Sequence, residues 1–136
     1  MGDREPSHLP DLADVIVLVV DDDLQLLVDL REQLELCFAS VLIAQTPLAA
    51  LWILEREPIH VVLCDLVLGS TDGGHLLQHV EERWPGTGRI LMTGFGDRVL
   101  DQKSFPAAQR VVLKPCDTDT IAALIAELHG VDSQPS

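Results

Sequence analysis

The sequence predicts an α/β fold in which helices cover both faces of a parallel sheet. Five short apolar runs recur along the chain, and segments with a helical spacing of apolar residues lie between them. The runs are aliphatic throughout, as expected for strands buried on both faces. Alternation of strands and helices predicts right-handed crossovers between parallel neighbours. A chain of 136 residues fits one domain and is too short for two ordinary ones.

The predicted strands are rich in Val, Ile and Leu. They span residues 15–20, 41–44, 61–64, 90–92 and 111–113. Helices are predicted from apolar stripes at a spacing of three or four residues. The stripes are Leu27, Leu30, Leu34 and Phe38; Leu48, Leu51 and Leu54; Leu76, Leu77, Val80 and Trp84; and Ile121, Leu124, Ile125 and Leu128. Asp23 is predicted to cap the first helix, and Thr46 followed by Pro47 opens the second.

The fourth crossover, residues 94–110, has the weakest helical pattern. Gly94, Gly96 and Pro106 interrupt it, so we expect the fourth helix to be short or irregular. The domain is predicted to span residues 14–130, with tails at 1–13 and 131–136.

The composition argues against several function classes. A formal net charge of -13 repels phosphate backbones and anionic lipids, so we expect no direct nucleic-acid binding and no membrane association. No aliphatic run approaches the roughly 20 residues of a membrane span. The first ten residues lack a secretory signal pattern, which favours a cytoplasmic location. The three cysteines show no CxxC spacing and predict neither a disulfide framework nor a zinc site.

Polar residues follow four of the five predicted strands. Asp21 and Asp22 follow the first, Asp65 the third, Thr93 the fourth and Lys114 the fifth. In an open parallel sheet, ligands bind beyond the carboxyl ends of the strands. We therefore expect these side chains to meet at one edge.

Three carboxylates at one edge need counter-charge. Two of them about 4 Å apart repel by roughly 4 kcal/mol at an effective dielectric of 20. Lys114 supplies one positive charge, and a divalent cation would supply two. Oxygen ligands without His or Cys favour Mg²⁺ over zinc. With such a cation bound, one carboxylate can attack a phosphoryl group, with Lys114 and the Thr93 hydroxyl on its oxygens.

Four motifs stand at the predicted strand ends: Val19-Val-Asp-Asp-Asp23, Cys64-Asp-Leu-Val-Leu-Gly-Ser-Thr-Asp-Gly73, Met92-Thr-Gly-Phe-Gly-Asp97 and Leu113-Lys-Pro115. They resemble the motifs of the receiver domain of bacterial response regulators. None is specific alone, but the four in order are, and the match spans about residues 14–130. The resemblance implies a chemotaxis-regulator-like, flavodoxin-like fold: one doubly wound (βα)5 domain with a parallel sheet of strand order 2-1-3-4-5.

The resemblance also implies a metal site. Asp22 would be a direct ligand of Mg²⁺ (or Mn²⁺), together with Asp65 and the backbone carbonyl of Val67. Asp21 would act mainly through a metal-bound water.

The phosphoryl chemistry implied by the resemblance centres on Asp65. It would accept a phosphoryl group from a phosphohistidine on a sensor histidine kinase or a phosphotransfer protein. Lys114 would pair with Asp65 and then with the phosphoryl oxygens, and Thr93 would be the switch hydroxyl. Pro115 resembles the family's proline after a cis peptide. The protein would be a switch of protein contacts and no enzyme beyond its own phosphorylation and dephosphorylation.

Departures from the family leave an alternative open, which rests on Val111 and on the weak fourth crossover. Gly69 stands where the family commonly has proline, which predicts a looser loop over the site. Val111 stands where the family usually has an aromatic that swings inward on activation. The alternative is a degenerate receiver that acts as a phosphorylation-independent interaction module. A third hypothesis, a Mg²⁺-dependent phosphatase, is disfavoured because Val67 occupies the place of that class's second acid.

Other candidate residues have structural interpretations. His75 and His79 lie one helical turn apart, a spacing that can bind zinc, but they flank an apolar stripe and are predicted to be solvated. Trp52 and Trp84 accompany apolar stripes and are predicted to be core residues.

Overall fold

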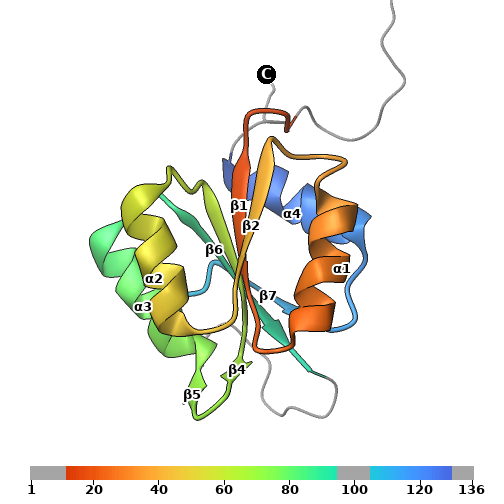
Figure 1. Ribbon diagram of the computed structural model, residues 1–136. Coiled ribbons are helices and arrows are strands. Elements are labelled where there is room, and N and C mark those ends of the chain that lie inside the picture. Colours follow the sequence, from red (N-terminus) through yellow and green to blue (C-terminus); the bar gives the residue numbers. More distant parts are fainter. Residues whose placement is uncertain (1–11, 95–104, 130–136) are drawn as a thin grey trace, which may run out of the picture.

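Five parallel strands form the central sheet of the computed structural model, which describes residues 12–94 and 105–129 (Figure 1). The strands are β1 (Ile16–Val20), β2 (Ser40–Ala44), β3 (Val61–Asp65), β6 (Gly88–Thr93) and β7 (Arg110–Leu113). Their order in the sheet is β2-β1-β3-β6-β7. Because β6 and β7 are the fourth and fifth predicted strands, the predicted fold and the order 2-1-3-4-5 are confirmed.

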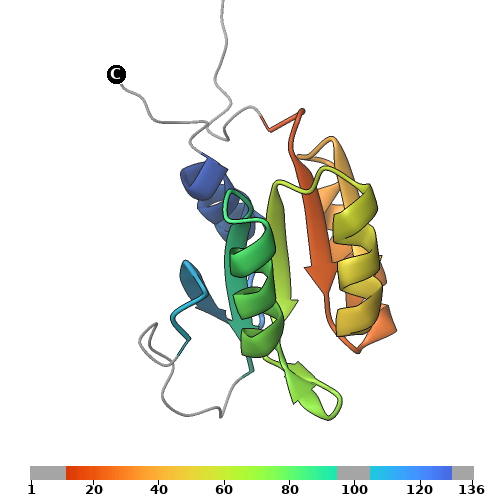
Figure 2. The same cartoon turned by 90° about the vertical axis from the view of Figure 1, so that its left-hand side faces the viewer.

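Helices cover both faces of this sheet, two on each in the described part of the chain. They are α1 (Leu24–Leu34), α2 (Pro47–Arg56), α3 (Gly73–Arg83) and α4 (Thr118–His129). Helices α1 and α4 lie on one face, and Figure 2 looks onto the other, which α2 and α3 cover. The capping predictions are confirmed. Asp23 accepts the N–H of Leu26 at the start of α1, and Thr46 accepts the N–H of Ala49 at the start of α2, whose first residue is Pro47.

Each face of the sheet has its own apolar core. The core under α1 and α4 includes Val17, Val19, Leu27, Leu30, Leu34, Leu63, Ile90, Met92, Ile121 and Ile125. The core under α2 and α3 includes Leu18, Val20, Leu54, Val62, Cys64, Leu76, Leu77, Val80 and Leu91. Successive residues of the central strands therefore enter opposite cores. This double burial explains why the strands are continuously apolar instead of alternating.

The expected irregular fourth helix falls mostly on residues 95–104, which lie outside the described residues. In the described end of this crossover, Phe105 to Gln109 form a turn that leads into β7. Arg89 anchors the turn, since its buried guanidinium donates to the carbonyls of Ala107 (2.6 Å) and Thr87 (2.8 Å).

A small hairpin follows β3 and was not predicted. Its strands β4 (Val67–Leu68) and β5 (Thr71–Asp72) pair antiparallel. The two residues between them are Gly69 and Ser70, and Gly69 has a φ of 64°. A positive φ at the first position of a two-residue loop is the geometry that favours glycine.

Three further observations concern the burial of apolar residues and the length of the helices. The core prediction is wrong for Trp52, which is 58% exposed beneath the Arg56 guanidinium, whereas Trp84 is partly buried against the core under α2 and α3. Leu12, inside the expected N-terminal tail, is 2% exposed. No helix among the described residues has the length and apolar character needed to cross a membrane.

Candidate functional site

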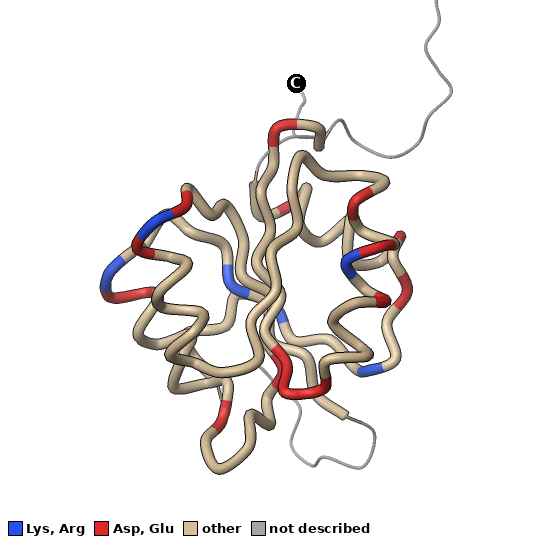
Figure 3. Tube along the Cα trace, viewed as in Figure 1, with Lys and Arg blue, Asp and Glu red and all other residues tan. Residues whose placement is uncertain are grey.

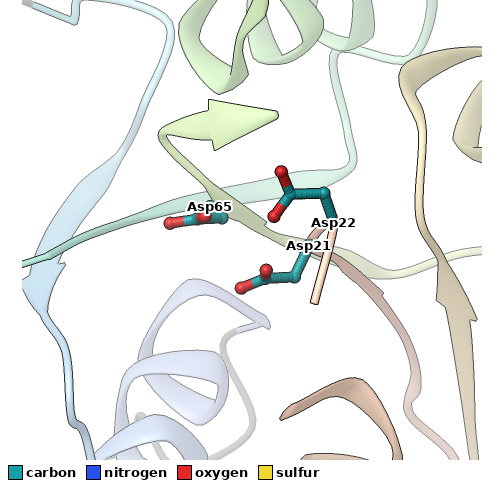
Figure 4. A group of neighbouring side chains, drawn as sticks. All are labelled: Asp21, Asp22 and Asp65. Carbon is teal, nitrogen blue, oxygen red and sulfur yellow. The ribbon is translucent and has the colours of Figure 1, made fainter. Parts of the chain in front are cut away.

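The two central strands bring the acidic residues together. Asp21 directly follows β1 and Asp65 ends β3, and these strands are parallel neighbours with Val20 opposite Cys64. Carboxylate oxygens of Asp21, Asp22 and Asp65 lie within 4.8 Å of one another (Figure 4). Figure 3 shows the acidic run at the end of β1 that contributes two of them. The predicted convergence of these three residues at one sheet edge is therefore observed.

Burial differs among the three acids. Asp21 is 1% exposed and Asp65 is 6% exposed, whereas Asp22 is exposed. Both oxygens of Asp21 have partners, since Oδ1 accepts the N–H of Asp23 (3.0 Å) and Oδ2 accepts from Lys114 (3.0 Å). Asp22 Oδ2 accepts the N–H of Gly69 (3.1 Å).

Lys114 reaches the acids from the end of β7. Its Nζ lies 3.0 Å from Asp21 Oδ2 and 3.3 Å from Asp65 Oδ1. Its backbone N–H donates to the carbonyl of Thr93 (2.7 Å), which ties the end of β7 to the end of β6. The peptide bond between Lys114 and Pro115 is cis, as the resemblance implied.

The charges that the described residues bring to this edge do not balance. Burial, followed by the charge of Asp21, raises the pKa of Asp65, and Lys114 offsets this only in part. Burial lowers the pKa of Lys114, but its hydrogen bond to Asp21 and the charge of Asp65 outweigh that effect and raise it. Within residues 12–94 and 105–129, the ammonium of Lys114 is thus set against the three carboxylates of the cluster, two of which it contacts.

A hard divalent cation fits this donor set. The three clustered side chains offer only oxygen ligands. Burial and then the charge of Asp21 disfavour the ionised form of Asp65, which a bound cation would favour. Val67, whose carbonyl was expected as a further ligand, opens β4 two residues after Asp65. Its place in the chain is thus close to the acids.

Thr93 ends β6, the strand next to β3. Its side chain is fully buried, and within the described part of the chain its Oγ1 has no hydrogen-bond partner. A buried hydroxyl in this state costs about 1–3 kcal/mol. The hydroxyl is therefore available to a new acceptor at this edge.

Two glycines of the site were missed as functional candidates. Gly73 starts α3 and donates its N–H to the carbonyl of Leu66 (2.6 Å). A Cβ at Gly73 would lie 2.1 Å from the Asp65 carbonyl oxygen, so only glycine permits this approach. Gly69 provides the N–H that Asp22 accepts. The Asp72-Gly73 pair directly before a helical stripe was the available signal for Gly73.

His75 and His79 are both exposed on α3, as predicted. His75 Nδ1 lies 3.2 Å from Asp72 Oδ1, the helix N-cap. Neither histidine belongs to a cluster of three or more metal-ligating side chains among the described residues.

Comparisons with known proteins agree with this geometry. A family model described as response regulator receiver domain matches residues 17–126. The hydrogenase transcriptional regulatory protein HoxA of Cupriavidus necator is 36% identical over 81 residues, 60% of this chain and 17% of HoxA. The response regulator protein FleR of Pseudomonas aeruginosa is 31% identical over 121 residues, 88% of this chain and 25% of FleR. The chain thus spans a quarter or less of the length of these two relatives.

A solved structure extends the agreement to three dimensions. The crystal structure of a CheY-like response regulator receiver domain protein from Methanospirillum hungatei superimposes with a TM-score of 0.75 at 27% sequence identity. The match covers 87% of this chain and 98% of that one.

Proposed function

Because the chain belongs to the response regulator receiver domain family, we propose that it is a phosphoacceptor switch in a two-component pathway. Asp65 accepts a phosphoryl group from a sensor histidine kinase or a phosphotransfer protein, and the change alters protein contacts. The observation that carries the proposal is the contact of Lys114 with Asp65 inside the three-carboxylate cluster. Receiver domains are signalling switches, and turnover of a separate substrate is not part of the proposal.

The transfer itself needs a nucleophile and a charge partner. A carboxylate oxygen of Asp65 attacks the phosphorus, and the bond from phosphorus to the donor's imidazole nitrogen breaks, with its electron pair leaving on the imidazole. The ammonium of Lys114, which lies 3.3 Å from Asp65 Oδ1, then pairs with the phosphoryl oxygens. A bound Mg²⁺ or Mn²⁺ would neutralise the charge that gathers on those oxygens.

The contacts of the acids support separate roles in holding the cation. Asp21 has both oxygens occupied by Asp23 and Lys114, which suits a residue that acts through a water. Asp22 is exposed and has one oxygen bound by a backbone N–H, so its other oxygen can serve as a direct ligand. Asp65 and the carbonyl of Val67 complete the proposed set.

The buried Thr93 hydroxyl supports its proposed role as the switch. A phosphoryl group on Asp65 would offer the acceptor that Thr93 Oγ1 lacks among the described residues. The gain of about 1–3 kcal/mol from satisfying this hydroxyl would favour the phosphorylated conformation. This gain is large enough to shift a two-state equilibrium about five- to 150-fold.

Phosphorylation is tested directly by intact mass. Incubation with Mg²⁺ and a small acyl-phosphate donor should add one phosphate, and Asp65→Asn should abolish the adduct. Asp119→Asn, on the exposed start of α4, is the matched control and should keep it. No adduct with any donor, or an adduct that survives Asp65→Asn, would contradict the proposal.

A phosphorylation-independent interaction module is the second candidate. The observation in its favour is Val111, which is only partly buried against the core under α2 and α3 and offers no ring to move. This candidate predicts that neither Asp65→Asn nor beryllofluoride, which mimics a phosphoryl group on aspartate, changes the affinity for a partner protein. The proposed switch predicts that beryllofluoride changes it.

Two further expectations, on nucleic-acid binding and on cellular location, also stay proposals. The net charge of -13 supports the absence of direct nucleic-acid contact by this domain, and a cytoplasmic location fits a kinase partner.

A further inference from the structure

Gly69 is bound to the acid cluster through its backbone. Its N–H donates to Asp22 Oδ2 over 3.1 Å, and the two residues are 47 positions apart in the sequence. The bond joins the hairpin formed by β4 and β5 to the turn between β1 and α1. These two segments carry the proposed ligands Val67 and Asp22.

The geometry at Gly69 depends on its residue type. Its φ of 64° lies in the left-handed region, which proline cannot adopt. Proline also lacks the N–H that makes the bond. Space is not the constraint, because a Cβ at Gly69 would meet nothing within 4 Å. A residue with an N–H and tolerance of positive φ, such as asparagine, can therefore replace it.

Asp22 needs such a contact to stay in the cluster. Its side chain is exposed, and Asp21 and Asp65 repel it. Lys114 contacts the other two acids, so its ammonium does not directly hold Asp22. Within the described residues, the Asp22 carboxylate accepts a hydrogen bond from the Gly69 N–H.

We propose that Gly69 is a positioning residue, whose N–H holds the Asp22 carboxylate in the acid cluster and aligns it with the hairpin that carries Val67. The cation that this arrangement favours is the divalent ion of the proposed function, on which the inference rests. An outer contact that orients a ligand typically changes metal affinity by 10- to 100-fold.

Mg²⁺ affinity of two variants tests the role of the N–H. Measured by titration calorimetry, Gly69→Pro should weaken Mg²⁺ binding about tenfold, equal to about 1.4 kcal/mol. Gly69→Asn keeps the N–H and should bind within about twofold of the parent protein. Equal affinity of Gly69→Pro and the parent would overturn the inference, as would an equal loss in Gly69→Asn.

A second measurement needs neither metal nor a proline variant. The Gly69 amide of the cation-free protein should be protected from hydrogen exchange, and Asp22→Ala should speed its exchange at least about tenfold, because the acceptor is gone. An amide that exchanges freely in the parent protein would overturn the inference. Failure of the parent to bind Mg²⁺ would instead refute the proposed metal site, while the exchange experiment still decides what Gly69 does.

Discussion

Replacing Gly73 by alanine tests how closely α3 must approach the end of β3, which carries Asp65. The new Cβ would lie 2.1 Å from the Asp65 carbonyl oxygen and 2.8 Å from Cys64 Sγ. Both atoms are fixed in the core, so the start of α3 or the end of β3 must move by about 1 Å. Overpacking against backbone belongs at the upper end of its usual range, about 3 kcal/mol.

Thermal unfolding followed by circular dichroism measures the effect. At about 4 °C per kcal/mol for a domain of this size, Gly73→Ala should lower the melting temperature by about 12 °C. Gly86→Ala is the matched control, because a Cβ there meets nothing within 4 Å, and it should stay within about 2 °C of the parent. A melting temperature for Gly73→Ala equal to that of Gly86→Ala would refute the reasoning.

Three other predictions concern stability. Burial and the neighbouring His129 lower the pKa of His60, whose Nδ1 accepts the Ile16 N–H (2.9 Å). The stability that neutral His60 contributes is therefore present above its usual pKa of 6.5 and is lost as pH falls through the lowered pKa. In urea titrations, the free energy of unfolding of His60→Asn should therefore fall less at acid pH than that of the parent protein. Arg89→Met should lower the free energy of unfolding by about 3 kcal/mol, since buried carbonyls lose a charged donor. Burial raises the pKa of Asp65, so its charge destabilises the cation-free fold at neutral pH, and Asp65→Asn should raise the melting temperature without Mg²⁺.

The sheet could be predicted because each strand is recognisable from a short run of apolar residues next to one another in the sequence. Double burial makes the central strands β1 and β3 continuous apolar runs. The acids, the threonine and the lysine mark where the apolar runs of the sheet end. Parallel strands place these ends at one edge, so the cluster of Asp21, Asp22, Asp65 and Lys114 followed from the order of the strands.

The features that escaped prediction depend on contacts distant in sequence or on very short elements. The hairpin has strands of two residues, too short for any periodicity. The bond between Gly69 and Asp22 joins residues 47 positions apart. Trp52 and Leu48 were assigned inward, yet both are exposed, because α2 uses Ala50 and Leu54 to face the sheet. A small alanine could not be recognised as the contact residue from hydrophobicity alone.

The site of phosphorylation tests the central claim most directly. Lys114 contacts both Asp65 and Asp21, but both oxygens of Asp21 are hydrogen-bonded and Asp22 is exposed to solvent. After treatment with Mg²⁺ and an acyl-phosphate donor, borohydride reduction would convert an aspartyl phosphate to homoserine, which peptide mass spectrometry can locate. The account predicts homoserine at position 65 alone. Modification at position 21 or 22, or at a histidine, would contradict it.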